Sequence, residues 1–261
     1  MDLEQVTQTA VRAAYRGCDV LRSRFGNLRT IGKKGPTDLV TDADTASEAE
    51  IIAAIRSSFP DHTIVAEESG VRKGPAAFRW LVDPLDGTVN YAHQVPFFAV
   101  SIAFVVGDDV RVGVVLNPVS GELFTARTGD GARLNGSPIR VSPETRVSES
   151  LLATGFPYDL THGFDAMGSR FLRCLRAARG VRRLGSAALD LCYVACGRFA
   201  GYWEDHLQPW DSAAGILMVR EAGGTVTNFS NQPSGAAAGE VLATNGHIHR
   251  ELLAFMEVEN S

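Results

Sequence analysis

The stretch Trp80-Leu81-Val82-Asp83-Pro84-Leu85-Asp86-Gly87-Thr88 decides the fold expected for this chain. Its first residues form a short apolar run that stops at an acidic residue, which predicts a buried strand over Trp80–Asp83. Pro84 fixes one backbone angle, and Gly87 permits an unusual one. The turn can therefore aim the two aspartates and the Leu85 carbonyl at one region. The alternative is an ordinary turn in which an aspartate only caps the chain.

Helices and strands are expected on both sides of this turn. Apolar residues at helical spacing predict a helix over residues 3–25. A second helix is expected after Asp44, with Thr45 and Glu48 as a capping box and an apolar stripe that ends at Pro60. The continuously apolar run Phe97–Val106 predicts a strand that is covered on both faces. Further strands are expected at Thr63–Ala66, Val110–Leu116 and Glu122–Ala126.

Beyond residue 147 the pattern changes to an alternation of helices and strands. Helices are expected at Asp165–Ala178, Ser186–Cys196, Ser212–Ala222 and His247–Phe255. Strands are expected at Gly201–Glu204, Thr225–Thr227 and Glu240–Ala243. We therefore predict one α/β domain over residues 1–261, built of two halves that meet near residue 145, with helix and sheet layers alternating.

Composition excludes several classes of function. The net charge of −5 and the pI near 5.7 argue against a nucleic-acid-binding surface. The arginines within residues 173–183 are spaced like a solvated helix face. The N-terminus lacks a signal-peptide pattern, and no apolar run is long enough to span a membrane. The four cysteines fit neither a zinc site nor a disulfide framework, so a cytoplasmic location is expected.

Acidic residues stand where apolar segments end, namely Glu67, Glu68, Asp83, Asp86 and Asp211. Carboxylates at strand ends lie on a rim that a rigid sheet holds in place. Converging carboxylates repel one another unless cations lie between them, and hard oxygen ligands suit Mg²⁺. The sequence therefore predicts a magnesium site with a neighbouring phosphate, which the helix start after Gly87 is expected to favour.

The motifs that carry this chemistry resemble those of the inositol monophosphatase family. Residues 83–91 (DPLDGTVNY) resemble its first signature, and residues 210–215 (WDSAAG) with 221–224 (EAGG) resemble its second. Residues 38–44 (DLVTDAD) and 66–69 (AEES) match flanking motifs in the same order. The resemblance implies a layered α-β-α-β-α sandwich, a homodimer, and inhibition of a Mg²⁺-dependent phosphatase by lithium.

The resemblance also implies a two-metal site. Glu67, Asp83 and the Leu85 carbonyl would hold the first Mg²⁺, and Asp83, Asp86 and Asp211 would hold the second. A third, weaker ion would bind near Glu67. Two ions roughly 3.5–4 Å apart stabilise both the attacking and the leaving oxygens of a phosphoryl transfer.

Catalytic roles follow from the same resemblance. Thr88 and Glu67 would orient and deprotonate the attacking water, and Asp44 would accept a hydrogen bond from the Thr88 hydroxyl. The amides of Gly87 and Thr88 would donate hydrogen bonds to the negatively charged oxygens of the phosphoryl group. Polyol contacts are implied for Asp86, Gly185, Ser186, Ala187 and Glu204. Lys33 aligns with a lysine on a flap near the third ion; the alternative is a solvated loop lysine.

Inositol monophosphate is therefore the expected substrate. The alternatives within the enzyme class are a fructose-1,6-bisphosphatase, a histidinol-phosphatase and a nucleotide 3′-phosphatase. The alternative outside it is a regulatory binding protein whose phosphatase activity is incidental. A regulator without activity would be expected to lose at least one of Glu67, Asp83, Asp86, Thr88 and Asp211, and all of them are present.

Overall fold

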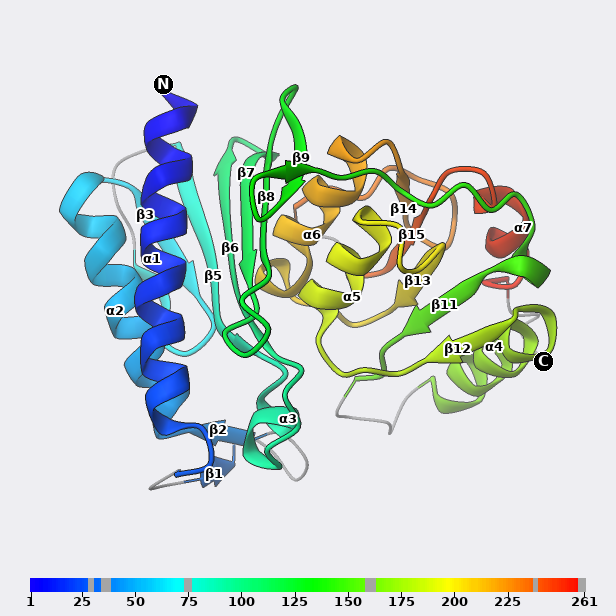
Figure 1. The fold of residues 1–261 in the computed structure, drawn as a ribbon, viewed down its shortest axis with the longest axis horizontal. Coiled ribbons are helices and arrows are strands. Elements are labelled where there is room, and N and C mark those ends of the chain that lie inside the picture. Colours follow the sequence, from blue (N-terminus) through cyan, green and yellow to red (C-terminus); the bar gives the residue numbers. More distant parts are fainter. Residues whose placement is uncertain (28–30, 34–38, 73–76, 158–162, 237–238, 258–261) are drawn as a thin grey trace.

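Helices and sheets alternate in five layers in the computed structural model, which describes residues 1–27, 31–33, 39–72, 77–157, 163–236 and 239–257. Two helices cover one face of a large sheet, two more lie between this sheet and a smaller one, and two others lie beyond the smaller sheet (Figure 1). This arrangement confirms the predicted α-β-α-β-α sandwich.

The first layer consists of α1 (Leu3–Arg24) and α2 (Asp42–Ser58). Asp2 caps α1, and the buried side of α1 packs on the large sheet. The predicted capping box of α2 was wrong. The helix begins earlier, with Thr41 as its N-cap and Asp44 as the reciprocal partner. Glu48 instead accepts hydrogen bonds from the amides of Glu68, at 2.8 Å, and Ser69, at 3.1 Å.

The second layer is an eight-stranded sheet in the order β10-β9-β8-β7-β6-β5-β3-β4. Only β3 and β5 run parallel, and the other neighbours in this sheet are antiparallel. As predicted, the apolar strand β6 is buried along nearly its whole length. The strands are β3 (Thr63–Ala66), β4 (Gly70–Arg72), β5 (Phe78–Asp86), β6 (Ala99–Val106), β7 (Asp109–Leu116), β8 (Leu123–Arg127), β9 (Gly131–Leu134) and β10 (Ser137–Pro138).

The middle layer holds α5 (Ala187–Ala195) and α6 (Pro209–Glu221). Both helices are apolar on nearly all sides because a sheet covers each face. Gly113 of β7 allows close packing here, since a Cβ atom on it would lie 2.9 Å from the carbonyl oxygen of Ala214 in α6.

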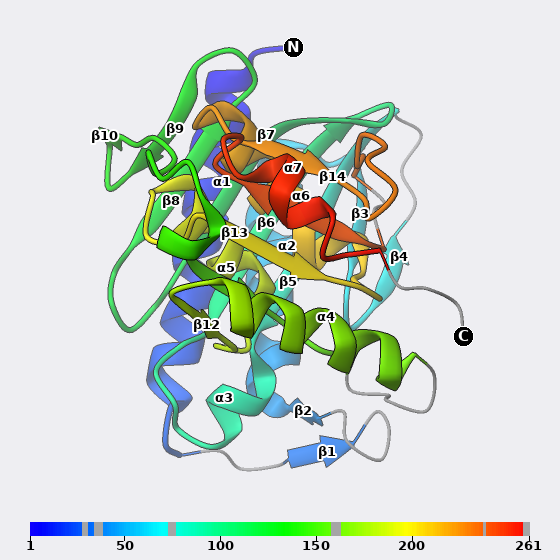
Figure 2. The same ribbon diagram turned by 90° about the vertical axis from the view of Figure 1, so that its right-hand side faces the viewer.

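The fourth layer is a five-stranded sheet in the order β12-β11-β13-β15-β14. Its strands are β11 (Leu151–Thr154), β12 (Gly180–Arg182), β13 (Gly201–Glu204), β14 (Thr225–Thr227) and β15 (Val241–Thr244). The sequence patterns missed β11 and β12, which pair in parallel. The outer layer holds α4 (Phe164–Ala177) and α7 (His249–Leu253), the latter shorter than expected (Figure 2).

Shorter elements complete the described chain. β1 (Ile31–Lys33) pairs with β2 (Leu39–Thr41), α3 (Thr88–Ala92) follows β5, and the 3-10 turn η1 (Val147–Glu149) precedes β11. No helix within these ranges combines the length and the hydropathy needed to cross a bilayer. The grouping of both sheets into one domain stays a prediction.

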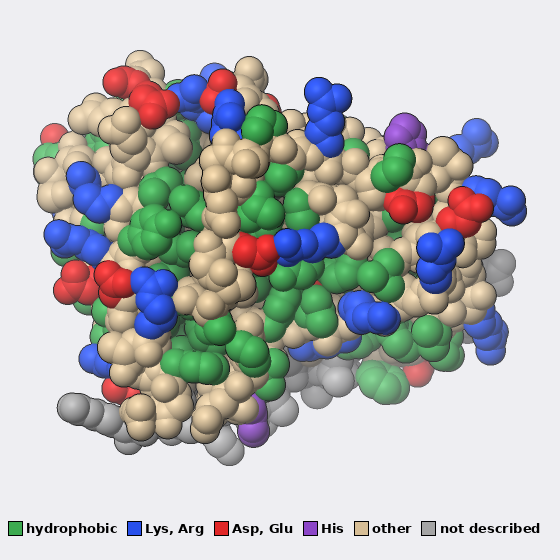
Figure 3. Space-filling view, in the orientation of Figure 1, with side chains coloured by type: hydrophobic (Ala, Val, Ile, Leu, Met, Phe, Trp, Pro, Cys, Tyr) green, Lys and Arg blue, Asp and Glu red, His purple; other side chains and the backbone are tan. Residues whose placement is uncertain are grey.

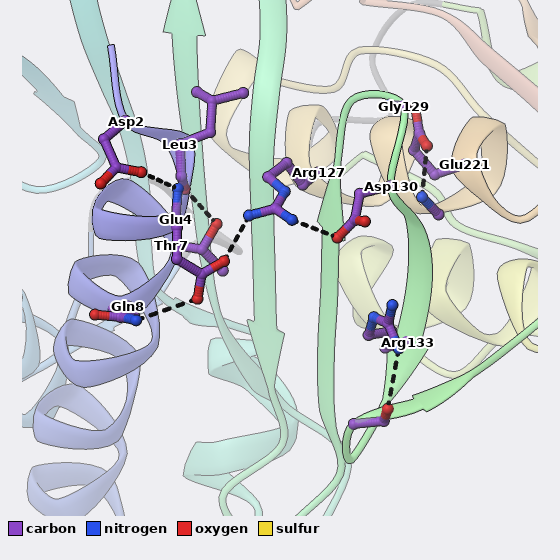
Figure 4. Close-up of polar contacts among 12 residues, drawn as sticks. Asp2, Leu3, Glu4, Thr7, Gln8, Arg127, Gly129, Asp130, Arg133 and Glu221 are labelled. Atoms are coloured by element: carbon purple, nitrogen blue, oxygen red, sulfur yellow. Dashed lines mark hydrogen bonds and ion pairs between the residues drawn. The ribbon is translucent and has the colours of Figure 1, made fainter.

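Polar contacts tie the layers together at the surface. Arg127 of β8 donates to Glu4 of α1 at 2.5 Å and to Asp130 at 2.7 Å (Figure 4). Glu221 of α6 accepts from the amides of Gly129 and Gly131, both at 3.0 Å, and so fixes the β8–β9 turn on the middle layer. On the face shown in Figure 3, Lys and Arg side chains lie among acidic ones around a central band of hydrophobic side chains.

Candidate active site

The parallel pair β3 and β5 places two acidic residues side by side. Ala66 lies opposite Val82 in the register, so Glu67 and Asp83 follow at the same end of the sheet. The amide of Glu67 donates to the carbonyl of Val82 at 3.1 Å. The carboxyl ends of parallel strands meet at one edge, which is why residues far apart in sequence converge here.

A bulge at the end of β5 directs the next carboxylate. The register with β6 shifts between Asp83 and Asp86, because Pro84 cannot donate to the ladder. The amide of Leu85 donates to Asp83 Oδ1 at 2.9 Å. Gly87 then adopts a φ of +96° as the residue before α3, and a Cβ atom on it would lie 3.1 Å from the Gly185 carbonyl oxygen.

The second half of the chain supplies the other wall of the site. Asp86 Oδ2 accepts from the Ser186 hydroxyl at 2.5 Å and from the Ala188 amide at 2.8 Å, which ties β5 to the start of α5. Asp211 lies in the first turn of α6 and accepts from the Gln208 amide at 2.7 Å. Glu204 ends β13 and accepts from the Tyr202 hydroxyl.

These residues face one pocket of about 640 Å³. Glu68 also lines it. Asp44 lies behind it, and the side chain of Lys33 lies outside the described residues. All other predicted site residues line the pocket, namely Glu67, Asp83, Leu85, Asp86, Gly87, Thr88, Gly185, Ser186, Ala187, Glu204 and Asp211.

The expected contact between Thr88 and Asp44 is present. The Thr88 hydroxyl lies 3.2 Å from Asp44 Oδ1 and 3.0 Å from the carbonyl oxygen of Leu85. Asp44 Oδ2 also accepts from the amide of Thr41 at 2.8 Å and from its hydroxyl at 2.5 Å. The buried Asp44 carboxylate therefore joins the start of α2 to the floor of the pocket.

Burial and repulsion shift the acidity of the pocket carboxyls. Burial raises the pKa of Asp83 well above its ordinary value, and the charges of Glu67, Asp86 and Asp211 raise it further. Burial raises the pKa of Asp86 to about 6, against the hydrogen bonds from Ser186 and from the α5 amides. Burial and the Asp86 charge likewise raise the pKa of Asp211. The protein alone does not neutralise this group of acids.

The chemistry of these donors fits a hard divalent cation. Four acidic residues and Leu85 line one pocket, and Mg²⁺ prefers the carboxylate and carbonyl oxygens that these residues carry. Hydrogen bonds from protein amides or hydroxyls already orient three of the carboxylates, those of Asp83, Asp86 and Asp211. Within the described ranges, however, no three Asp, Glu, His or Cys side chains stand together as a complete ligand group for one ion.

Sequence patterns missed several residues around this pocket, among them Glu48, Gly155 and Arg183. Glu48 holds the turn that follows Glu67, as described above. Gly155 and Arg183 both line the pocket. The prediction that Arg183 lies on a solvated helix face is wrong, because α4 ends at Ala177 and Arg183 follows the strand β12 into the pocket lining. Gly155 lies next to Glu204 because β11 and β13 run parallel, with Thr154 opposite Trp203. No local signal in the sequence marks such a tertiary neighbour.

The fold and the site together define a class of protein. Its members are five-layer α/β sandwiches with an acidic pocket at the ends of two parallel strands. The model of the inositol monophosphatase family matches residues 2–259. The inositol-1-monophosphatase of Synechocystis is 46% identical over 253 residues, which cover 96% of this chain and 88% of the relative. The Nus factor SuhB of Haemophilus influenzae is 44% identical over 247 residues, which cover 94% and 92%.

A solved structure agrees with this comparison. The extragenic suppressor protein suhB of Bartonella henselae matches with a TM-score of 0.93 and 40% identity, over 98% of this chain and 99% of that one. The chain belongs to the inositol monophosphatase family, which confirms the resemblance seen in its motifs.

Proposed function

We propose that this protein is a Mg²⁺-dependent phosphomonoesterase that hydrolyses inositol monophosphate to inositol and phosphate. The observation that carries the proposal is the convergence of Glu67, Asp83, Asp86 and Asp211 on one pocket that also holds Glu204. Family membership and the name of the Synechocystis relative support the same reaction.

The metal ligands in this proposal come from the acidic wall of the pocket, which consists of Glu67, Asp83, Asp86 and Asp211. Glu67, Asp83 and the Leu85 carbonyl would hold one Mg²⁺, and Asp83, Asp86 and Asp211 would hold a second. A third, weaker ion would bind near Glu67. When bound, Mg²⁺ supplies the positive charge that stabilises the oxygens of the transferring phosphoryl group.

Thr88 is the residue proposed to position the attacking water. Its hydrogen points to the Asp44 carboxylate or to the Leu85 carbonyl, since both acceptors are within reach. The hydroxyl oxygen then has only lone pairs to offer, so it accepts a hydrogen bond from water and orients it. Glu67, on the same pocket wall, takes the proton as general base. Gly87 and Thr88 also line the pocket and are the candidate amide contacts to the phosphate.

The remaining lining residues are proposed to bind the polyol. Ser186 is the N-cap of α5, and its hydroxyl donates to Asp86. This hydrogen bond joins the side of the pocket proposed to bind the metals to the side proposed to bind the polyol. Gly185 and Ala187 flank Ser186 in the lining, and Glu204 faces the same space from β13. Glu204 would accept hydrogen bonds from ring hydroxyls remote from the phosphate.

A phosphate-release screen tests the function. The purified protein is incubated with inositol 1-phosphate, fructose 1,6-bisphosphate, histidinol phosphate and a nucleotide 3′-phosphate, each with Mg²⁺ and with EDTA. Inositol 1-phosphate is expected to give the highest kcat/KM, and EDTA is expected to abolish release. A preference of tenfold or more for another ester would replace the proposed substrate by that of a sister phosphatase.

A partner-binding role is the second candidate, and the SuhB-named relatives favour it. The two roles separate in a catalytically inactive variant. Cells in which the gene is deleted are complemented with the parent protein and with Asp83→Asn. If both reverse the defects of the deletion equally, the role is binding and the phosphatase activity is incidental. If only the active enzyme reverses them, hydrolysis is the role. The predicted absence of nucleic-acid binding stays a prediction.

Quaternary structure and location belong to the same proposal. A homodimer and a cytoplasmic location stay predictions. All four cysteines are free in the structure, which is consistent with a reducing compartment. Light scattering coupled to gel filtration measures the mass, which a homodimer would double.

A further inference from the structure

Arg183 brings a positive charge to a pocket with many acidic residues. Its guanidinium donates to the carbonyl oxygen of Phe156 at 3.3 Å, and both residues line the pocket. Its positive charge acts on the carboxyl of Glu204, whose pKa it lowers against the effect of burial. A guanidinium carries five N–H donors, so one contact to a carbonyl leaves most of them for a ligand.

The neighbouring carboxylate of Glu204 is held tightly in place. The Tyr202 hydroxyl donates to it, and Gly155 packs directly against it. A Cβ atom on Gly155 would lie 1.8 Å from Glu204 Oε2, so only a glycine there leaves the carboxylate its position. Burial raises the pKa of Glu204 to about 7, against the Tyr202 hydrogen bond and the Arg183 charge. A fixed acceptor and a fork of donors therefore face the same end of the pocket.

Resting on the proposed function, we propose that Arg183 is a specificity-determining residue that recognises a polyol. Glu204 accepts a hydrogen bond from one ring hydroxyl, while the Arg183 guanidinium donates to the oxygen of a neighbouring hydroxyl. Each hydroxyl of a ring polyol is both donor and acceptor, so an acceptor beside a donor fits a vicinal diol. A second phosphate fits this end less well, because the carboxyl group of Glu204 also lines it.

The test compares two esters that share a ring and a phosphate. Inositol 1-phosphate has ring hydroxyls, and cyclohexyl phosphate has none. The substitution Arg183→Met keeps an unbranched stem of comparable flexibility and removes all of the N–H donors. It is expected to lower kcat/KM for inositol 1-phosphate about tenfold to hundredfold, the usual range for a hydrogen bond to a charged group. The value for cyclohexyl phosphate is expected to stay within about twofold.

The adjacent arginine provides a matched control. Arg182 is also exposed, but it contacts the Val181 carbonyl and is not among the lining residues of the pocket. Arg182→Met is expected to leave both esters unchanged. Arg183→Lys is expected to recover only part of the loss, because an ammonium lacks the planar fork.

The outcomes separate this inference from the proposed function. A parent protein that does not hydrolyse inositol 1-phosphate overturns the proposed function and the inference with it. A parent that does, combined with an equal loss on both esters or with no loss in Arg183→Met, overturns the role of Arg183 alone. A larger loss on fructose 1,6-bisphosphate than on inositol 1-phosphate also overturns it, since Arg183 would then bind a second phosphate.

Discussion

The carboxylate of Asp44 accepts hydrogen bonds from the amide and the hydroxyl of Thr41, and the Thr88 hydroxyl lies within reach of it. If Thr88 positions the attacking water, Thr88→Ala lowers kcat far more than it raises KM, because the interaction matters mainly in the transition state. Steady-state kinetics with inositol 1-phosphate measure this. Thr88→Ser keeps the hydroxyl and is expected to retain most of the activity.

The partnership of the two residues is tested by a double mutant. Asp44→Asn is expected to act in the same direction as Thr88→Ala, and the double mutant to be little worse than Thr88→Ala alone. Because Asp44 also closes the cap of α2, its unfolding transition is measured in parallel. Losses in kcat that add up would mean that the residues act independently.

The raised pKa of Glu204 predicts that the preference for a polyol substrate depends on pH. Its pKa is raised to about 7, so the carboxyl takes up a proton as the pH falls through that value and loses part of its capacity as an acceptor. We therefore expect the ratio of kcat/KM for inositol 1-phosphate to that for cyclohexyl phosphate to fall between about pH 8 and pH 6. The ratio cancels the titration of metal ligands and of the phosphate.

Glu204→Gln is the control for that profile, because a neutral amide does not titrate in this range. Its ratio is expected to be low and flat. A parent ratio that is constant across the range would remove Glu204 from the binding of the polyol.

At the level of single residues, the sequence predicted the acidic residues of the pocket but only some of the residues that line its opposite side, which we propose to bind the polyol. Asp83, Asp86 and Thr88 follow one another along a single turn, so a local motif reveals them. Arg183 and Gly155 join the site only through the pairing of β11 with β12 and β13. Their short strands carry no pattern that predicts this pairing.

At the scale of elements, strands with clear flanking turns were predicted well. The bounds of β3, β13 and β14 agree with the expectation, whereas β12 consists of three residues, two of them glycine and arginine. The start of α2 was misplaced because Thr45 and Glu48 imitate a capping box. The true cap, Thr41, uses an aspartate at N3 where glutamate or glutamine is usual, so the pattern did not single it out.

The link between β5 and α3 depends on one glycine. Gly87 has a φ of +96°, and a Cβ atom would lie 3.1 Å from two carbonyl oxygens, those of Phe97 and Gly185. Gly87→Ala is expected to destabilise the fold by more than the ~1–2 kcal/mol that a left-handed residue costs, since backbone must also move. Thermal unfolding is the measurement, with a fall in Tm of roughly 2–4 °C per kcal/mol.

The substitution Gly121→Ala is the control that separates backbone strain from steric crowding. Its φ is +71°, but nothing lies within 4 Å of an added Cβ atom. Gly121→Ala therefore carries the conformational cost alone. Equal effects of the two substitutions would show that the close approach of Gly87 to Gly185 is unimportant for stability.

At the scale of the whole molecule, both sheets contribute residues to the pocket. The first half contributes the ends of β3 and β5, and the second half contributes the starts of α5 and α6 and the end of β13. Asp86 joins both halves through Ser186 and Ala188. Cations that bind this acidic wall would therefore stabilise the arrangement of the halves as well as the reaction.

Asp83 lies at the centre of this wall, and its substitution tests metal binding through folding. Without metal, Asp83→Asn removes a buried charge that Glu67, Asp86 and Asp211 repel. The Asn oxygen can still accept the hydrogen bond from the Leu85 amide. The variant is therefore expected to unfold at a higher temperature than the parent in EDTA near neutral pH. The expected direction follows from the pKa of Asp83, which is higher in the folded than in the unfolded protein. The free energy of unfolding therefore decreases as the pH rises above the unfolded-state pKa.

In the presence of Mg²⁺ the parent is expected to have the higher Tm. Binding to the folded state raises stability by RT ln(1 + [Mg²⁺]/Kd), so the Tm of the parent rises along a Mg²⁺ titration. Asp83→Asn lacks the carboxylate proposed to bridge two ions, so its Tm responds weakly and its Mg²⁺-dependent turnover is lost. Glu68→Gln removes a carboxylate that lines the same pocket but is not a proposed ligand, and it is expected to behave like the parent. If Asp83→Asn gains as much Tm from Mg²⁺ as the parent, or keeps turnover within tenfold of it, Asp83 does not bridge the metals and the two-metal proposal is wrong.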